Sequence, residues 1–191
     1  MQELFFNCNG KIIKNGDKTI LAGILNVTPD SFSDGGKYFS VDKALEQAKN
    51  MMANGAGIID IGGESTRPGS EAITEEEEIK RIIPVIREIR KEYKDVIISI
   101  DTWRAKVAKA SIEEGADIIN DITGLLGDKN MAEVIANSKC GLVAMFNPVI
   151  ARPEHEGSRV FRTFGYEKPF SDEALKYFTT LSIVELMKEY F

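Results

Sequence analysis

The sequence lacks the features of a disulfide framework, a membrane span or an exported precursor. Its only two cysteines, Cys8 and Cys140, stand far apart without metal-ligand spacing, which is typical of a reduced cytosolic protein. No apolar run approaches the roughly 20 residues that a membrane helix needs. The N-terminus has no basic stretch followed by a long apolar run, so it does not read as a signal peptide. We therefore expect a cytoplasmic protein without a membrane partner.

The chain also has no excess of positive charge. It contains 24 Lys and Arg residues and 30 Asp and Glu residues, which give a net charge of −6. This charge argues against a nucleic-acid binder, which needs a basic surface to bind phosphates. A small anionic substrate stays compatible with this total, because the local charge of a cleft matters more. With 43% hydrophobic residues among 191, the chain can bury the core of one domain, residues 1–191.

Short apolar runs alternate with amphipathic stretches along most of the chain. The predicted strands are Thr19–Asn26, Gly57–Ile61, Val96–Asp101, Asp117–Ile122 and Gly141–Phe146. Their near-continuous Ile, Leu and Val indicate strands of a parallel sheet, buried on both faces. Helical patterns lie between them: one through residues 44–52, one opening at a capping-box pattern from Thr74, one over roughly 103–114, and a shorter one near Asp128.

Alternating strands and helices are compatible with either a barrel or an open, doubly wound sheet. Polar residues at the ends of several strands, Asn26, Asp101, Asn120 and Asp121, favour a TIM-type (β/α)8 barrel, whose strand ends line one mouth. Only about five of the eight strands are identifiable. A capping-box pattern at Ser182 opens a helix that reaches Phe191 without a stop signal, so we expect a barrel domain truncated at its C-terminus. Residues 147–170, rich in Pro, Gly and Arg, predict a long loop.

Two segments combine a strand with a polar, glycine-containing loop. One is Gly23–Gly36 and the other Ile59–Gly69. Glycines permit close approach of a ligand to the backbone, and Arg67 offers a planar donor fork to an anion. Each loop has an ordinary structural explanation, because Asp and Ser after a strand often cap the next helix and Gly-Gly pairs permit tight turns. That explanation accounts poorly for polar groups arriving repeatedly at the same end of buried strands.

Both segments resemble the hallmark segments of the dihydropteroate synthase family. Asn-Val-Thr-Pro-Asp-Ser-Phe-Ser-Asp-Gly-Gly at 26–36 and Gly-Gly-Glu-Ser-Thr-Arg-Pro-Gly at 62–69 match without an internal gap, in the family's order. The match extends through Ser99–Thr102 and Ile118–Gly124 and covers about residues 20–146. The resemblance implies condensation of 6-hydroxymethyl-7,8-dihydropterin diphosphate with p-aminobenzoate, giving 7,8-dihydropteroate and diphosphate.

The resemblance also implies roles for individual residues. Asn26 matches the asparagine that the family associates with Mg²⁺, the expected cofactor, and an amide oxygen is a hard ligand suited to that ion. Asp101 and Asn120 match the positions that recognise the pterin, where a carboxylate accepts and an amide both donates and accepts. Thr66 matches a contact to the diphosphate-bearing substrate.

Four further residues match the loops that close over the substrates and shape the p-aminobenzoate pocket in this family: Phe32, Ser65, Arg67 and Pro68. Sulfonamides mimic p-aminobenzoate in such enzymes, so the resemblance implies a sulfonamide target. The family tends to dimerise, which implies a homodimer for the full-length form. Small molecules are the only other partners we expect.

The chain departs from the family in lacking its later segments, which supply an aspartate, a lysine and an Arg-x-His motif. The single histidine, His155, lies in the loop after the fifth strand and cannot replace the missing one. We therefore do not expect the 191-residue chain to be active alone. Two other functions stay open: a pterin-binding module of a methyltetrahydrofolate-dependent methyltransferase, and an inactive half-barrel that pairs with a separate chain or has no function.

Overall fold

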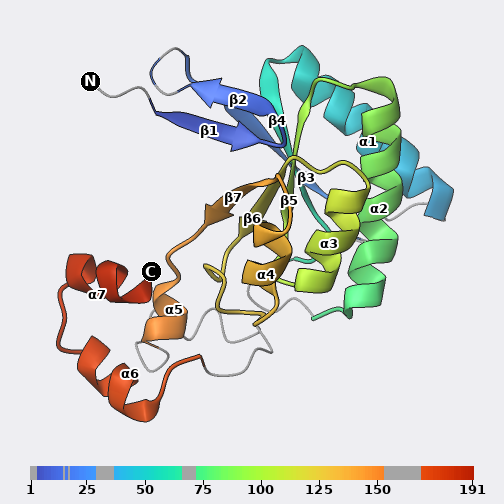
Figure 1. The fold of residues 1–191 in the computed structure, drawn as a ribbon. Helices are drawn as coiled ribbons and strands as arrows, with labels where there is room; N and C mark the ends of the chain where they lie inside the picture. The colour runs from blue at the N-terminus through green and yellow to red at the C-terminus, as the bar shows by residue number, and fades with distance from the viewer. Residues whose placement is uncertain (1–3, 15, 17, 29–36, 66–71, 153–168) are drawn as a thin grey trace.

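The computed structural model describes residues 4–14, 16, 18–28, 37–65, 72–152 and 169–191. A parallel sheet of five strands is its centre (Figure 1). The strands are β3 (Leu21–Asn26), β4 (Ala56–Gly62), β5 (Ile97–Asp101), β6 (Ile118–Asp121) and β7 (Gly141–Ala144). They lie in sequence order, β3-β4-β5-β6-β7. The five predicted strands are confirmed, with ends that differ by at most two residues.

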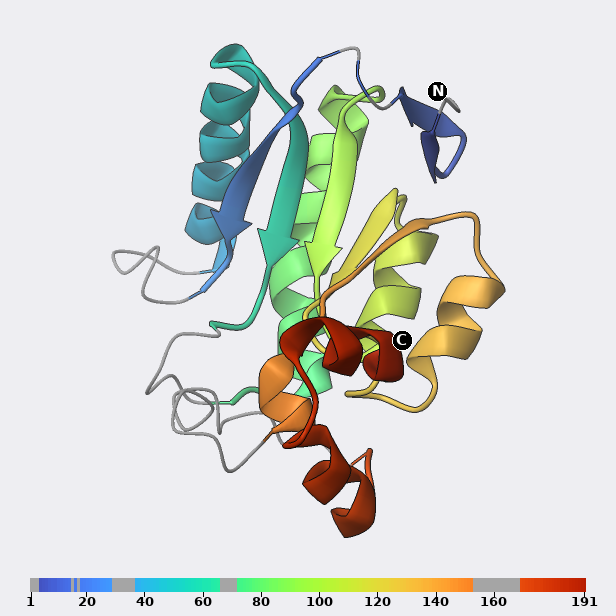
Figure 2. The same ribbon diagram turned by 90° about the vertical axis from the view of Figure 1, so that its left-hand side faces the viewer.

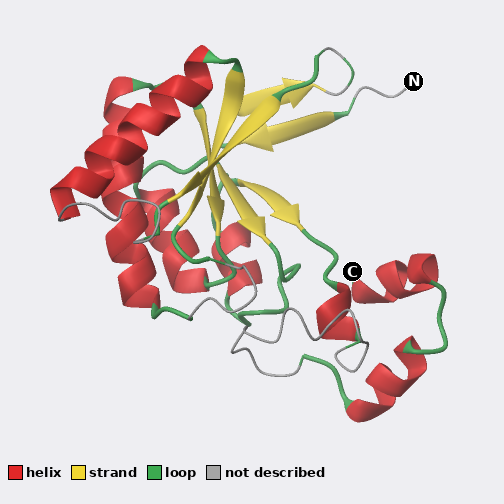
Figure 3. Ribbon diagram, turned by 180° about the vertical axis from the view of Figure 1, so that it is seen from behind, coloured by secondary structure: helices red, strands yellow, loops and turns green. Residues whose placement is uncertain are grey.

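Four helices connect these strands: α1 (Lys37–Ala53), α2 (Glu75–Glu92), α3 (Ala105–Glu113) and α4 (Met131–Ala136). All four pack on the same face of the sheet and leave the other face open (Figures 2 and 3). A doubly wound sheet would carry helices on both faces. Sequential strands with helices on one side are a sector of a (β/α)8 barrel, so the predicted barrel, incomplete with five strands, is confirmed.

The core lies between the sheet and these helices. The strands contribute five fully buried isoleucines to this core: Ile59, Ile61, Ile98, Ile100 and Ile119. Helix α2 supplies Ile82, Ile86 and Ile89, which are also fully buried. Thr74, where the predicted capping-box pattern begins, caps this helix by accepting from the Glu77 N–H at 3.2 Å. Gly55, just after α1, has φ +96°, a conformation that favours glycine at the end of a helix.

An antiparallel hairpin that the sequence analysis missed lies at the start of the chain. Its strands are β1 (Phe5–Cys8) and β2 (Lys11–Lys14). Asn9 and Gly10 form the turn with φ +53° and +89°. An Asn-Gly pair between apolar runs is the strongest short-range signal of a hairpin, so the information was present. The hairpin reaches the end of the sheet where strands begin, since the Asn9 N–H donates to the Lys139 carbonyl at 2.9 Å.

Three helices follow β7: α5 (Pro148–Ala151), α6 (Asp172–Phe178) and α7 (Ile183–Tyr190). The prediction of a loop over 147–170 was wrong at α5, where the Asn147 side chain caps one helical turn by accepting from the Val149 N–H. Residues 153–168 of that stretch lie outside the described residues. The capping box at Ser182 and Glu185 is confirmed. No helix in the described part of the chain is long and apolar enough to cross a membrane.

Helix α7 lies against the loop that follows β6. The buried Tyr190 hydroxyl donates to the Thr123 carbonyl at 2.6 Å, and its ring meets Phe146 edge-on at 5.0 Å between centroids. Tyr190→Phe should therefore lower the free energy of unfolding by about 1 kcal/mol, because the carbonyl loses a buried donor. Urea unfolding followed by circular dichroism measures this. Tyr177→Phe, at an exposed position of α6, is the control; equal midpoints for both variants would contradict the expectation.

Candidate functional site

Residues of four adjacent strands, three of them polar and the fourth a glycine, form a row at the carboxyl end of the sheet. In the strand register, Asn26 pairs with Gly62, Gly62 with Asp101, and Asp101 with Asn120. Side chains alternate along a strand, and the neighbours Leu25, Ile61, Ile100 and Ile119 face the helices. The row therefore faces the open side of the sheet, which is the inside of the barrel. The three strand-end residues that the sequence predicted as site residues are thus brought together.

Asp60 lies one step deeper on the same face, two residues before Gly62. The Asn120 amide donates to its Oδ2 at 3.4 Å. Its Oδ1 is the one buried side-chain polar atom in the described residues without a hydrogen-bond partner. A buried carboxylate oxygen without a donor is costly, and such atoms concentrate where a ligand completes the bonding. Asp60 was not among the predicted site residues, and its position on this face makes it part of the candidate site.

Asp101 is the most perturbed carboxyl of the row. Burial, with smaller contributions from the nearby charges of Asp60, Glu78, Asp121 and Glu64, raises its pKa from 3.8 to about 7. A ligand that offers N–H donors would stabilise the ionised form of this carboxyl, because hydrogen bonds from such donors favour the charged carboxylate.

Gly62 separates Asn26 from Asp101 and leaves space between them. A methyl group built on Gly62 would stand 3.6 Å from Asn26 Oδ1 and 3.7 Å from Asp101 Oδ2, so both oxygens line the same small space. The described residues hold no group of three His, Cys, Asp or Glu side chains able to bind a metal ion. A cation bound at exposed Asn26 would therefore take most of its ligands from substrate and water.

Asp121 organises the loop after β6. Its Oδ1 accepts from the Thr123 N–H and hydroxyl, both at 2.7 Å, and its Oδ2 accepts from the Leu125 N–H at 2.9 Å. Leu125 and Gly124 have positive φ, and these bonds offset the strain at Leu125. Asp121 is fully buried, and both of its carboxylate oxygens already accept hydrogen bonds from the loop that follows it. Its role is therefore to fix the conformation of this loop next to Asn120.

A buried ion-pair cluster at the start of α3 was not predicted. Arg104 is 6% exposed, and its guanidinium contacts Glu64 Oε1 at 2.9 Å and Oε2 at 3.0 Å. The same guanidinium pairs with Glu78 of α2 and donates to the Ile73 carbonyl at 2.8 Å. The Trp103 ring lies 4.5 Å from the guanidinium carbon, and its N–H donates to Glu64 Oε2 at 3.2 Å.

The structure describes only one of the five remaining predicted site residues. Phe32, Thr66, Arg67 and Pro68 lie outside the described residues, so their assignments stay predictions. Ser65 is half-buried and directly follows Glu64 of the cluster. Ser65 lies three residues beyond Gly62, the last residue of β4 and the member of the row that β4 contributes.

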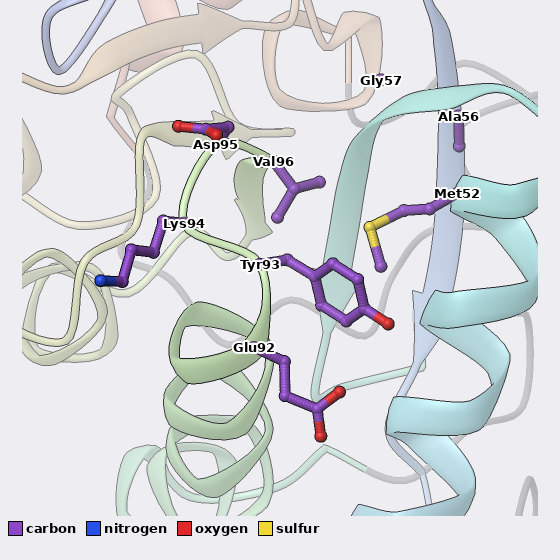
Figure 4. A pocket seen from close by; sticks show the side chains of 8 residues that line it. All are labelled: Met52, Ala56, Gly57, Glu92, Tyr93, Lys94, Asp95 and Val96. Carbon is purple, nitrogen blue, oxygen red and sulfur yellow. The ribbon is translucent and has the colours of Figure 1, made fainter.

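A pocket of about 410 Å³ lies at the opposite end of the sheet (Figure 4). Ala56 and Gly57 line it from the start of β4, Val96 from the residue before β5, and Tyr93 from the end of α2. The amino ends of parallel strands meet there, whereas ligand sites of barrels lie at the carboxyl ends. The polar row and its orphan carboxylate oxygen therefore define the candidate site, and this pocket does not.

The fold and the site together define an α/β-barrel protein whose candidate ligand site lies at the carboxyl ends of its strands. The model of the family described as pterin binding enzyme matches residues 22–179, and the chain belongs to this family. The match runs beyond residue 146, where the recognisable motifs end.

Individual relatives agree with this assignment. A dihydropteroate synthase from Bacillus subtilis is 57% identical over 138 residues, 72% of this chain and 47% of the relative. One from Clostridium beijerinckii is 53% identical over 132 residues, 69% of this chain and 49% of the relative. The solved structure of Xanthomonas albilineans dihydropteroate synthase with 4-aminobenzoic acid has a TM-score of 0.72 at 37% identity, covering 81% of this chain and 55% of that one. The chain spans about half the length of these relatives.

Proposed function

We propose that this chain supplies the pterin-binding half of a dihydropteroate synthase. The whole protein condenses 6-hydroxymethyl-7,8-dihydropterin diphosphate with p-aminobenzoate to give 7,8-dihydropteroate and diphosphate. The observation that carries the proposal is the unsatisfied Asp60 Oδ1 beside Asp101 and Asn120. A pterin edge carries an exocyclic amine, a ring N–H and ring acceptors, and these groups complement two carboxylates and an amide.

In this reaction the aromatic amine attacks the methylene carbon, the C–O bond breaks, the diphosphate leaves with the electron pair, and the amine loses a proton. Asp101 and Asn120 orient the pterin ring so that the methylene group points toward the mouth of the barrel. Asn26, at the mouth beside Gly62, is the residue that would hold Mg²⁺, which when bound offsets charge on the diphosphate. Thr66 contacts the diphosphate-bearing substrate, and Phe32, Ser65, Arg67 and Pro68 shape the p-aminobenzoate pocket. The full-length form is a homodimer.

Ligand titration tests the proposal. In isothermal calorimetry, the chain should bind 6-hydroxymethylpterin, and Asn120→Ala should weaken binding about tenfold because a buried amide contact is lost. Asn130→Ala, at the exposed start of α4, is the matched control. Absence of pterin binding by the wild-type chain and by a version extended to the length of its relatives would refute the proposal. Binding of methyltetrahydrofolate, with no p-aminobenzoate binding in the extended version, would favour a methyltransferase module instead.

A further inference from the structure

The loop that follows β6 begins next to Asn120, and its first residues have an unusual backbone. Asp121 ends β6, and Gly124 and Leu125 have φ of +62° and +71°. A residue with a side chain keeps such a conformation only where neighbouring groups hold it. Within the loop, Asp121 binds the N–H groups of Thr123 and Leu125. The carbonyl groups of the same loop need donors from elsewhere.

Two successive carbonyl groups of this loop accept hydrogen bonds from the C-terminal helical part of the chain. The Asn147 amide nitrogen donates to the Ile122 carbonyl at 3.0 Å. The Tyr190 hydroxyl donates to the next carbonyl, that of Thr123, at 2.6 Å. Both donors are buried, with exposed fractions of 4% and 6%, so a carbonyl that lost its donor would stay unsatisfied. A methyl group built on Gly124 would stand 2.7 Å from Tyr190 Cε1, so the ring also packs against the loop backbone.

The two donors belong to one packed unit of the helices α5, α6 and α7, and α5 and α7 lie where the strands of the sheet end (Figures 1 and 2). The Asn147 side-chain oxygen caps α5 by accepting from the Val149 N–H at 3.1 Å. At the other end of α5, Arg152 donates to the Phe178 carbonyl at 2.9 Å and to the Leu181 carbonyl at 2.6 Å. The unit has its own small core, separate from the core under the sheet: Ile150, Ala151, Phe178, Leu186 and Tyr190.

We propose that Asn147 and Tyr190 are positioning residues for the pterin, because they fix the loop that directly follows Asn120. The proposal rests on the proposed function, which makes Asn120 a pterin contact. Within the described residues, the Asn120 amide makes one side-chain hydrogen bond, the long one of 3.4 Å to Asp60. Its orientation therefore depends on the backbone that carries it. A released loop samples further conformations, and only a fraction of them presents the amide to a ligand.

Two variants remove one donor each and keep the rest of the side chain's role. Tyr190→Phe retains the packed ring, and Asn147→Ser retains an oxygen that can cap α5 but is too short to reach the Ile122 carbonyl. Each should weaken 6-hydroxymethylpterin binding about fivefold in calorimetry. The double variant should lose less than the product of the two effects, because either change already releases the same loop.

Ser171→Ala is the matched control. It removes the cap of α6, where the exposed Ser171 hydroxyl accepts from the Ala174 N–H at 3.2 Å, and so loosens the same helical unit without touching the loop after β6. Pterin affinity should stay within about twofold of the wild type. A loss in Ser171→Ala as large as in Tyr190→Phe would show that the helical unit contributes only general stability, and would overturn the positioning role.

The side-chain amide resonance of Asn120 gives a reading without ligand. In ¹⁵N-edited NMR spectra, assigned with Asn120→Ala, this resonance should shift in Tyr190→Phe and in Asn147→Ser. It should stay in place in Ser171→Ala, and the exposed Asn130 amide should stay in place in all variants.

The experiment combines these spectra with calorimetry of the chain, or of a version extended to the length of its relatives where pterin binding needs it. An unshifted Asn120 resonance together with unchanged pterin affinity would overturn the proposal. Tyr190→Phe carries the test alone if Asn147→Ser does not fold. Failure of the wild type to bind pterin would instead refute the proposed function, and the ligand-free spectra would still show whether the two donors position Asn120.

Discussion

Replacing Asp101 by Asn should abolish pterin binding and at the same time stabilise the protein above pH 7. The loss of affinity is expected to be about 100-fold or more, because the amide presents a donor where the pterin amine and ring N–H also donate. The gain in stability has a different origin. Burial first, and then neighbouring carboxylates, raise the Asp101 pKa to about 7, so the ionised form is disfavoured in the folded protein and Asn removes that cost.

The raised pKa of Asp101 determines whether the stability of the wild type rises or falls with pH. Between the ordinary pKa of 3.8 and the folded value of about 7, the folded state binds the proton more tightly than the unfolded chain. The wild type therefore loses stability as the pH rises through this window, by at most about 4 kcal/mol, and then levels off. Asp101→Asn lacks this loss. The two proteins should unfold alike near pH 4, and the variant should be the more stable one at pH 8.

Urea unfolding of wild type and variant at pH 4, 6 and 8 measures the difference. Asp95→Asn, an exposed carboxylate just before β5, is the matched control and should show no such pH-dependent gap. Pterin affinity of the wild type should fall about tenfold for each pH unit below 7, because the proton must leave before Asp101 accepts two donors. A wild type more stable at pH 8 than at pH 5, measured against Asp101→Asn, would contradict the assignment.

Sequence patterns predicted the sheet because its strands carry their own signal. Buried parallel strands read as continuous runs such as Ile97–Ile100, whatever packs against them. The polar ends Asn26, Asp101 and Asn120 were predicted to share a mouth, and the register confirms it. This inference needed only the rule that carboxyl ends of parallel strands meet at one edge.

Side-chain contacts between residues far apart in the sequence were not predictable in the same way. Arg104, Glu64 and Glu78 come from three separate elements, and each alone reads as an ordinary surface charge. Likewise the first N–H of α3, at Ala105, is satisfied by the Asp128 carboxylate at 2.9 Å, which comes from the loop after β6. Such contacts depend on which loops the barrel brings together, and periodicity contains no information about that.

The largest loss of stability on substitution is expected at Asp117, at the end of the sheet opposite the site. This residue is 3% exposed, and its Oδ2 accepts from Lys11 at 2.8 Å, from Arg90 at 2.6 Å and from the Ile98 N–H at 2.9 Å. Lys11 comes from the N-terminal hairpin and Arg90 from the last turn of α2. One carboxylate oxygen therefore ties the hairpin and a helix to two neighbouring strands.

Asp117→Asn should destabilise the protein by about 3 kcal/mol, because two partly buried cations then lie together without their shared counter-charge. Chemical denaturation should show this loss, and hydrogen exchange should show the hairpin amides opening first, since Lys11 is the side chain of β2 that loses its partner. Glu114→Gln, which breaks the exposed pair with Arg87, is the control and should leave the midpoint nearly unchanged. Adding Lys11→Met to Asp117→Asn should recover part of the loss by removing one unpaired cation. Equal midpoints for Asp117→Asn and Glu114→Gln would show instead that Arg90 and Lys11 are satisfied by the Val96 carbonyl, to which both also donate at 2.8 Å.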